Sequence, residues 1–243
     1  MIVAVHQPHY LPWLRYVDKA ARADVFVLLD DAQYTKNGWQ NRNRIKTAQG
    51  WTYLTVPVEE PFGKPISEVR ICNRENWRRK HWNTLRTHYG RAPSFRRYAE
   101  AFEEVYAREW EHLCTLNLHL LERIFGLLGL RTRLVRSSEL GIPGRATERL
   151  VAICRTLGAS AYLTGDYAAT NHLEVRQFEE AGIEVWLQNW NCPPYRQQFP
   201  QAGFVPDLSI VDLLFNEGDR ALEILLGRPQ KPLPLEAAGI SQR

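Results

Sequence analysis

The first thirty residues constrain the fold of this chain most strongly. Two short, continuous apolar runs, Ile2 to Val5 and Val25 to Leu29, lie on either side of a segment with helical apolar spacing, Pro12 to Arg22. Apolar runs of this length between polar loops are typical of buried strands. A strand, a helix and a strand in this order form a unit with two parallel strands and a right-handed connection. The sequence therefore predicts that the chain begins with a βαβ unit.

Polar side chains follow both predicted strands. His6 and His9 follow the first strand, and Asp30 follows the second. Ligands of open α/β sheets bind at the carboxyl ends of the strands, so these three are the predicted catalytic residues, with a histidine as general base and Asp30 orienting it. Gln7 and Tyr10, in the same loop, are predicted to contact the substrate. The alternatives are that a histidine only shapes its loop and that an aspartate caps a turn. We expect no metal site here.

Strands and helices alternate again later in the chain. Strands are predicted at 53–58, 66–72, 132–135, 161–163 and 183–187. Helices are predicted at 74–89, 94–107, 111–128, 147–157, 171–181, 208–215 and 221–226. This alternation is typical of a three-layer α/β fold with a mostly parallel, Rossmann-like sheet. We expect one domain over residues 1–226, with a helical insertion at 73–130 and a flexible proline-rich tail at 227–243.

The loop after the second predicted strand is cationic. It has no acidic residue from Ala32 to Lys46. In an extended segment its two neighbouring arginines would face one way and its asparagines the other, and paired guanidinium groups suit phosphate or carboxylate recognition. A solvated surface turn is the alternative. The residues of this loop predicted to bind an anionic small-molecule substrate are Gln33, Tyr34, Lys36, Trp39, Asn41, Arg42, Asn43 and Arg44.

Two later strand ends add three predicted substrate-binding residues. Gly165 and Asp166 follow the strand at 161–163, where a glycine permits close approach of a ligand to the backbone. Gln188 follows the strand at 183–187, where its amide would contact a polar substrate. A simple tight turn is the alternative explanation of the glycine.

A basic block extends from Arg74 to Arg97. It holds seven arginines and one lysine against one glutamate, with Trp77, His81 and Trp82 among them. Arginines beside rings that can stack suit single-stranded RNA or the acceptor stem of a tRNA. The block therefore makes tRNA a candidate partner, and a solvated helix face is the alternative.

Composition limits the class of protein. Of 243 residues, 44% are hydrophobic and 24% charged, as in ordinary globular proteins. A net charge of +4 is too small for a protein that coats nucleic acid. The four cysteines form no C-x-x-C pair, and neither a signal peptide nor an apolar run of about 18 residues is present. We therefore expect a cytoplasmic protein with no membrane insertion.

Several stretches resemble the WbqC-like family. They are HQPHYLPWLRYVDKAARADVFVLLDDAQYTKNGWQNRNRI, WTYLTVPV, YLTGD, GIEVWLQNW with Tyr195 and Gln197 after it, and LSIVDLLFNEG. The resemblance covers nearly the whole chain apart from the tail and, more weakly, the basic block. It implies a bacterial protein associated with surface-polysaccharide biosynthesis. It also implies a transferase role on an amino-sugar or a related small molecule.

The beginning of the chain is similar, more weakly, to pantothenate synthetases and related nucleotidylyltransferases. Those enzymes carry His-x-Gly-His on the first helix, where it stabilises the phosphates of ATP. Tyr10 to Trp13 stands at the corresponding place here, with neither histidine nor glycine. The catalytic signature of that family is therefore not carried over.

Three functions remain open from the sequence. The first is acyl or aminoacyl transfer to an amine of an amino-sugar, a nucleotide-sugar or a related small molecule, with phosphates bound by Lys36, Arg42 and Arg44. The second is an ATP-dependent nucleotidylyltransferase or ligase that uses ATP with Mg²⁺. The third is a non-catalytic RNA-binding protein.

Overall fold

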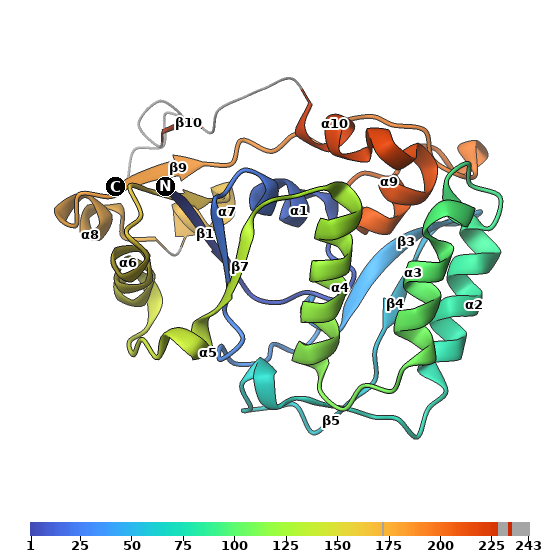
Figure 1. The fold of residues 1–243 in the computed structure, drawn as a ribbon, viewed down its shortest axis with the longest axis horizontal. Helices are drawn as coiled ribbons and strands as arrows, with labels where there is room; N and C mark the ends of the chain where they lie inside the picture. The colour runs from blue at the N-terminus through green and yellow to red at the C-terminus, as the bar shows by residue number, and fades with distance from the viewer. Residues whose placement is uncertain (172, 228–232, 235–243) are drawn as a thin grey trace.

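A six-stranded sheet forms the centre of one half of the molecule (Figure 1). The computed structural model describes residues 1–171, 173–227 and 233–234. In spatial order the strands are β10 (Leu233–Pro234), β9 (Glu184–Leu187), β8 (Ala161–Thr164), β1 (Ile2–His6), β2 (Val25–Leu28) and β7 (Arg133–Arg136). All are parallel except β10, which pairs antiparallel with β9. The predicted Rossmann-like, mostly parallel sheet is confirmed.

The strand order creates a topological switch point between β1 and β8. The chain runs from β1 outward through β2 to β7, then returns to β8 on the other side of β1 and continues to β9. The last paired residues of β1 and β8 are Ala4 and Leu163, so His6 and Gly165 each follow two residues later at the same edge. Sheets of this kind bind ligands in the crevice at the switch point.

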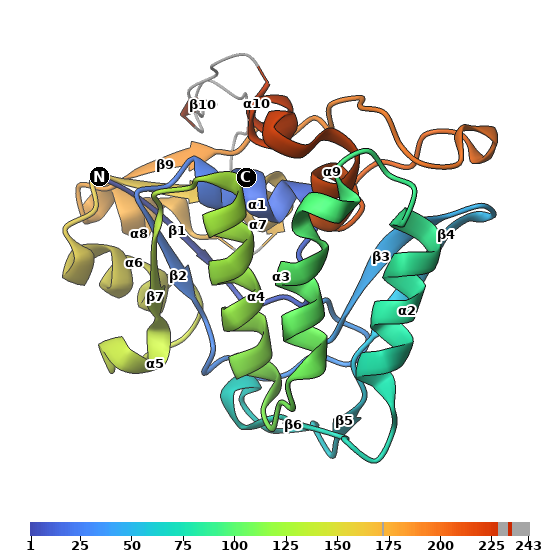
Figure 2. The same ribbon diagram turned by 45° about the vertical axis from the view of Figure 1, so that its right-hand side comes forward.

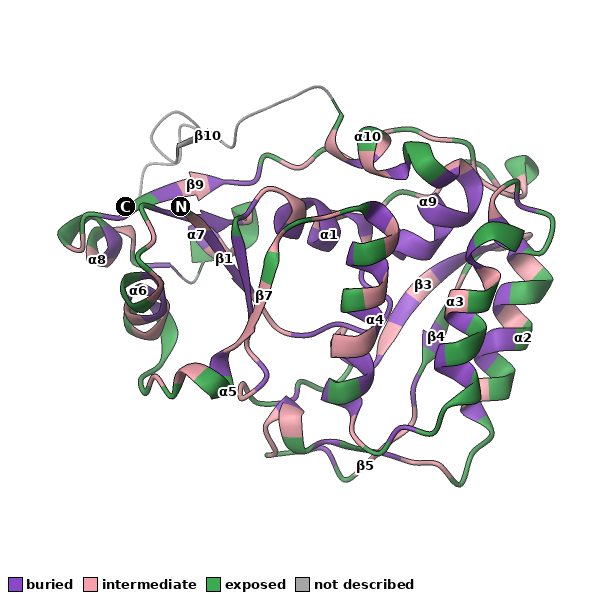
Figure 3. Ribbon diagram, in the orientation of Figure 1, coloured by how far each residue is buried: buried purple, intermediate pink, exposed green. Residues whose placement is uncertain are grey.

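Helices cover both faces of the sheet. The buried valines of β1 and β2 pack with α6 (Ala146–Leu157) and α8 (Val175–Glu180). Phe26 points to the opposite face, where it packs with α1 (Leu14–Ala21) and α4 (Leu113–Leu128). Because successive side chains of a strand point to opposite faces, β1 and β2 contribute to both clusters. Figure 3 shows these strands buried and the outer faces of the helices exposed.

Three helices and a hairpin form the other half of the molecule (Figure 2). They are α2 (Trp77–Tyr89), α3 (Phe95–Ala107) and α4, with the hairpin of β3 (Arg42–Thr47) and β4 (Gly50–Thr55). The apolar faces of these helices belong to the same hydrophobic cluster as α1 and Phe26. The helices lie within the insertion predicted at 73–130, and the domain boundaries stay a prediction.

Several predicted boundaries differ from the structure. The strand predicted at 53–58 is divided, because Pro57 cannot donate a ladder hydrogen bond. The region 66–72 contains a 3₁₀ turn at Ile66–Glu68 before a two-residue strand, and the helix predicted at 171–181 is replaced by two shorter ones. The remaining elements are β5 (Val58–Glu59), β6 (Arg70–Ile71), α5 (Ser137–Leu140), α7 (Asp166–Asn171), α9 (Ile210–Glu217), α10 (Ala221–Leu226) and the 3₁₀ turns Pro200–Ala202 and Gly218–Arg220.

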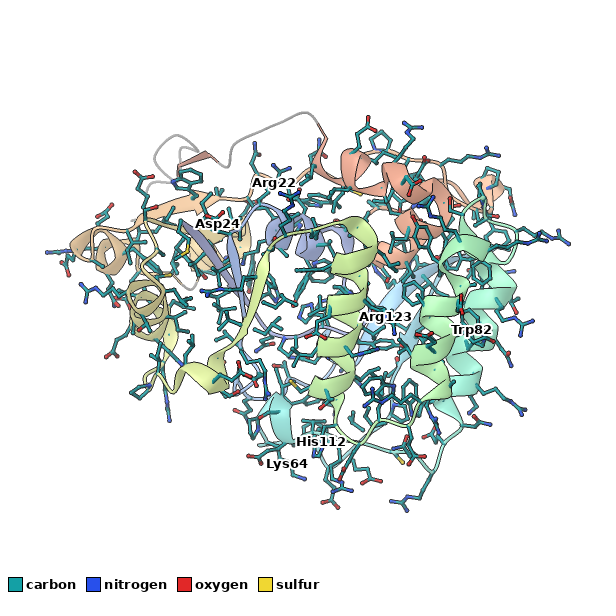
Figure 4. The ribbon with its side chains drawn as sticks, viewed as in Figure 1. Arg22, Asp24, Lys64, Trp82, His112 and Arg123 are labelled. Atoms are coloured by element: carbon teal, nitrogen blue, oxygen red, sulfur yellow. The ribbon has the colours of Figure 1, made fainter. Side chains whose placement is uncertain are left out.

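Near its end the described chain folds back over α1. Arg22, labelled in Figure 4, donates a hydrogen bond of 3.1 Å from Nη2 to the carbonyl of Leu226 at the end of α10. Of the tail predicted at 227–243, only Gly227 and Leu233–Pro234 lie within the described residues; the rest of that prediction lies outside them. Among the described residues, no helix is both long enough and apolar enough to cross a bilayer.

Candidate functional site

Three basic side chains meet at the carboxyl end of β1. The ring centroids of His6 and His9 are 4.6 Å apart, and both rings pack against Tyr16 of α1, at 4.8 and 5.0 Å. Lys19, almost one turn further along α1, donates a hydrogen bond of 3.1 Å from Nζ to the carbonyl of Val5. We call His6, His9 and Lys19 the switch-point cluster.

Burial controls the ionisation of the switch-point cluster. It lowers the pKa of His9 to about 3 and that of Lys19 to about 8. The pKa of His6 is also lowered well below its usual value, first by burial and then by the charges of His9 and Lys19. At neutral pH both imidazoles are therefore neutral while Lys19 is mostly charged. His6 is half-buried and His9 is buried, so His6 is the imidazole that a substrate can reach.

Buried acceptors without partners surround the same loop. Asn117 of α4 donates to the carbonyl oxygens of Pro8 (3.3 Å) and Gln40 (2.8 Å). The side-chain amide of Gln40 donates to that of Gln7 at 2.7 Å. Yet Nδ1 of His9, Oε1 of Gln40 and Oδ1 of Asn117 have no hydrogen-bond partner among the described residues. Because buried polar atoms are nearly always paired, these three indicate a site that a polar ligand completes.

Asp30 contacts the other neighbour of β2 rather than the histidines. Its carboxylate accepts hydrogen bonds from the Nε of Arg136 (2.8 Å) and from the backbone N and Oγ of Ser138 (3.0 and 2.7 Å). Burial alone would raise the pKa of Asp30, but these bonds from Ser138 and Arg136 together hold it below its usual value. No histidine is among its hydrogen-bond partners in the described chain. The prediction that Asp30 orients a histidine is therefore corrected, because the neighbouring strand supplies its partners and it anchors β7 to β2.

The residues after β8 and β9 lie on the opposite side of the switch point. A Cβ built on Gly165 would lie 4.0 Å from Oε1 of Gln188. The Gln188 amide donates to Asp18 of α1 (2.8 Å) and to the carbonyl of Arg15 (2.7 Å). Asp166 is the first residue of α7. Gln188 thus ties β9 to α1, and its oxygen faces the turn at Gly165.

The cationic loop alternates as predicted, with half-buried arginines and buried asparagines along β3. Two predicted substrate contacts, Asn43 of this loop and Tyr10 of the histidine loop, are nevertheless core residues. Asn43 is fully buried and donates to the carbonyl of Tyr10 at 3.3 Å. Tyr10 is also fully buried, with its hydroxyl 2.8 Å from Nδ1 of His81 and 2.6 Å from the hydroxyl of Tyr106. The partners of Tyr10 on α2 and α3, and the bond from Asn43 to the backbone of Tyr10, hold both side chains away from any surface site.

The other loop residues fall into two groups. Arg44 lies over the rings of Trp51 and Trp39, at 5.2 and 5.8 Å, and Gln33 is exposed and forms a backbone bridge with Pro65. Four further predicted residues line a separate pocket of about 240 Å³, namely Tyr34, Lys36, Asn41 and Arg42. The structure therefore does not gather all the predicted residues into one cleft.

Most aromatic rings of the basic block are not available for stacking. Trp77, His81, Trp82 and Tyr89 are buried. Trp82, labelled in Figure 4, donates from its indole to Glu103 of α3 at 3.1 Å. The prediction that these rings would stack on RNA bases is corrected, because they form the interface between α2 and the core.

Sequence reasoning missed Lys19, Gln40 and Asn117. A signal for Lys19 was present, because it follows the buried Tyr16 by three residues and so lies on the apolar stripe of α1. Nothing comparable marks Asn117, which reaches the loop at Pro8 from a helix more than a hundred residues later.

Comparison with known proteins supports one family. The family model described as the WbqC-like protein family matches residues 7–224. An uncharacterized protein of Mycobacterium tuberculosis, Rv1507c, is 38% identical over 227 residues, covering 92% of this chain and 96% of the relative. No solved structure matches significantly, so the similarity to nucleotidylyltransferases stays a prediction. With a match over almost its whole described length, the chain belongs to the WbqC-like protein family.

Proposed function

We propose that this protein is a cytoplasmic transferase that moves an acyl or aminoacyl group onto an amine of an amino-sugar or nucleotide-sugar in surface-polysaccharide biosynthesis. The observation that carries this proposal is the switch-point cluster, in which a reachable neutral imidazole lies beside a buried ammonium group. The unpartnered side-chain oxygens of Gln40 and Asn117 are acceptors, which suit the hydrogens of an amine or a hydroxyl group.

The cluster supplies the two functions that acyl transfer to an amine requires. As the amine nitrogen forms its bond to the acyl carbon, His6 takes the amine proton and later gives it to the departing group. The bond between the acyl carbon and that group breaks in the same sequence. The ammonium of Lys19 stabilises the negative charge that develops on the acyl oxygen, in a site of low dielectric. An anionic substrate bound here would raise the pKa of His6 toward the working pH.

Mass spectrometry can test this reaction directly. The purified protein is incubated with amino-sugars and nucleotide-linked amino-sugars, together with acyl thioesters or aminoacyl-tRNA as donors. We expect the acyl mass to appear on the amine. His6→Gln should reduce the rate about 10²- to 10⁴-fold, which is the usual contribution of a general base. Replacement of the half-buried His88 by glutamine should leave the rate at the wild-type value. Full activity of His6→Gln would refute the assignment.

Nucleotidyl transfer is the second candidate, favoured by the strand order. The switch point between β1 and β8 is where doubly wound sheets bind nucleotides. The aspartates that follow β2 do not fit Mg²⁺, because Asp30 and Asp31 are engaged by Arg136 and Arg149. No three His, Cys, Asp or Glu side chains form a metal-binding group in the described part of the chain. We derive no step through Mg²⁺. Release of pyrophosphate from ATP that depends on His6 would favour this reaction over acyl transfer.

A third proposal is that the protein binds tRNA, either as the carrier of an aminoacyl donor or as its sole activity. This proposal depends on the charge of the basic block alone. Arg79, Lys80, Arg86 and Arg91 are exposed and have no ion pair within the described residues. Phosphate contacts from such a surface weaken steeply with salt. Retention of tRNA on a filter at low salt, lost in Arg79→Gln/Arg86→Gln, would support this partner, and absence of retention would remove it.

A further inference from the structure

We infer that the pocket at Lys36 and Arg42 is a second ligand site, which binds the carboxylate or phosphate group of a small molecule with a flat or apolar body. It lies between the loop that joins β2 to β3 and the segment around β5. Neither histidine of the switch-point cluster lines it, nor does Lys19. Its lining residues are Tyr34, Lys36, Asn37, Asn41, Arg42, Thr55, Val58, Pro61 and Phe62. The inference does not depend on the reaction proposed above.

The charge of this pocket has one sign. Two of its lining residues are cations and none is a carboxylate. Neither cation forms an ion pair within the described residues, and each lies over an aromatic ring: the Arg42 guanidinium is 4.5 Å from the ring centroid of Tyr53, and Nζ of Lys36 is 5.8 Å from that of Phe62. The described residues therefore leave both charges without a counter-ion, and an anionic group would supply one.

The guanidinium group of Arg42 is held in place by the protein and still has unused hydrogen-bond donors. Its Nη2 donates to the carbonyl of Asn37 at 2.5 Å, and its Cζ lies over the ring of Tyr53. Its Nε is buried and has no hydrogen-bond partner among the described residues. A planar guanidinium with unused donors matches the two oxygens of a carboxylate or phosphate. Since its orientation is set by the protein, little freedom is lost when the anion binds.

One wall of the pocket is apolar. Phe62, which is 63% exposed, lines the pocket together with Val58 and Pro61. The backbone N of Tyr34 donates to the carbonyl of Lys64 at 2.9 Å, which fastens this wall to the cationic loop. Figure 4 labels Lys64 at the lower edge of the molecule.

The size of the pocket limits the ligand. Its volume of about 240 Å³ is below the lower end, about 300 Å³, of sites that enclose drug-sized ligands. It would hold an anionic group with one ring or a short chain, and not a whole nucleotide-sugar. Gln40 contacts Gln7 in the histidine loop, and the next two residues, Asn41 and Arg42, line the pocket. One short segment thus borders both sites.

Calorimetric titration with three related probes tests the inference. Benzoate carries a carboxylate, phenyl phosphate carries a phosphate, and benzamide is a neutral molecule of the same shape as benzoate. We expect one or both anions to bind at least tenfold more tightly than benzamide, because hydrogen bonds to charged groups contribute that much. The tighter of the two anions identifies the ligand class.

Variants locate the binding. Arg42→Gln and Lys36→Gln should each weaken the preferred anion on the order of tenfold. Lys36 is exposed, so its loss does not disturb the core even if Arg42→Gln folds poorly. His6→Gln should bind the anion normally, which separates this site from the proposed reaction, and the exposed Arg155→Gln on α6 is the matched surface control. Equal binding of benzamide and both anions, or unchanged affinity in Lys36→Gln and Arg42→Gln, would overturn the inference.

Discussion

Replacing Lys19 by methionine is expected to stabilise the protein and to abolish its activity. Lys19 is buried, and burial lowers its pKa from 10.5 to about 8. Ionised Lys19 therefore costs the folded state about 3 kcal/mol at pH 7. The hydrogen bond from its Nζ to Val5 returns about 1 kcal/mol. Lys19→Met, which keeps the length of the chain and removes the charge, should gain about 2 kcal/mol, or roughly 4 to 8 °C in Tm for a protein of this size.

The pH dependence of that gain has a definite sign. When burial lowers the folded-state pKa of a lysine, the folded protein is destabilised wherever that lysine is charged. The free energy of unfolding is therefore highest above the unfolded pKa of 10.5 and falls as the pH drops toward 8. The advantage of Lys19→Met should therefore be complete at pH 7 and disappear as the pH rises to about 10.5.

Urea unfolding at pH 7, 8, 9 and 10 measures this difference, with exposed Lys80→Met as the control that should stay near wild type. A Lys19→Met protein that is less stable at pH 7, or that is stable and fully active, would refute the reasoning. The first outcome would give Lys19 a structural role, and the second would remove it from the site.

Three other substitutions test particular contacts by urea unfolding. Burial raises the pKa of Asp212 to about 6. The stability that this residue contributes is therefore present below about pH 4 and is lost as the pH rises through 6. The free energy of unfolding should fall by up to about 3 kcal/mol between pH 4 and 7 because of this residue, and Asp212→Asn should abolish that fall. Tyr10→Phe should cost about 1 to 3 kcal/mol by leaving two buried groups unpaired, with KM unchanged because the hydroxyl faces the core. Gly218 has φ +58°, and an added Cβ would lie 2.4 Å from Oγ of Ser94, so Gly218→Ala should cost more than about 1 kcal/mol. The matched Gly126→Ala, in an open helical position, should stabilise by about 1 kcal/mol.

The sheet was predictable because its strands carry their own signal. Continuous runs such as Val25 to Leu29 are buried on both faces, so they show no alternation and stand out from the amphipathic helices around them. Short or interrupted strands such as β5 and β6 lack this signal. Their position depends on pairing with each other, Val58 with Ile71, which local sequence does not reveal.

In the basic block, the number of aromatic rings led to a wrong prediction of RNA stacking, although the spacing of these rings indicates a buried helix face. Trp77, His81, Leu85 and Tyr89 recur every four residues, and all four are buried. That spacing marks one face of a helix. Read by periodicity, these rings belong to the core and the arginines between them to the solvent. The prediction of stacking on RNA followed from counting the rings and not from their positions.

The candidate site was predictable in position but not in membership. His6 and Asp30 both end strands at the ligand-binding edge, and sequence alone treats them alike. The strand order separates them, because β8 lies beside β1 while β7 lies beside β2. Asp30 therefore accepts hydrogen bonds from Arg136 and Ser138, which lie about a hundred residues later in the chain. Such partners depend on the topology of the whole sheet.

Unfavourable local terms gather on one side of the sheet edge. Around Asp30 the described structure pairs each carboxylate oxygen. Around His6 it buries a charged Lys19 with one hydrogen bond, leaves Nδ1 of His9 unpaired, and holds Leu11 at φ +41°, a left-handed conformation that costs a branched residue about 1 kcal/mol or more. Folds retain such costs where a ligand offsets them, and the unpaired Nε of Arg42 at the second site has the same explanation. This asymmetry argues that the ligand binds between β1 and β8, on the histidine side, and that the aspartates support the sheet.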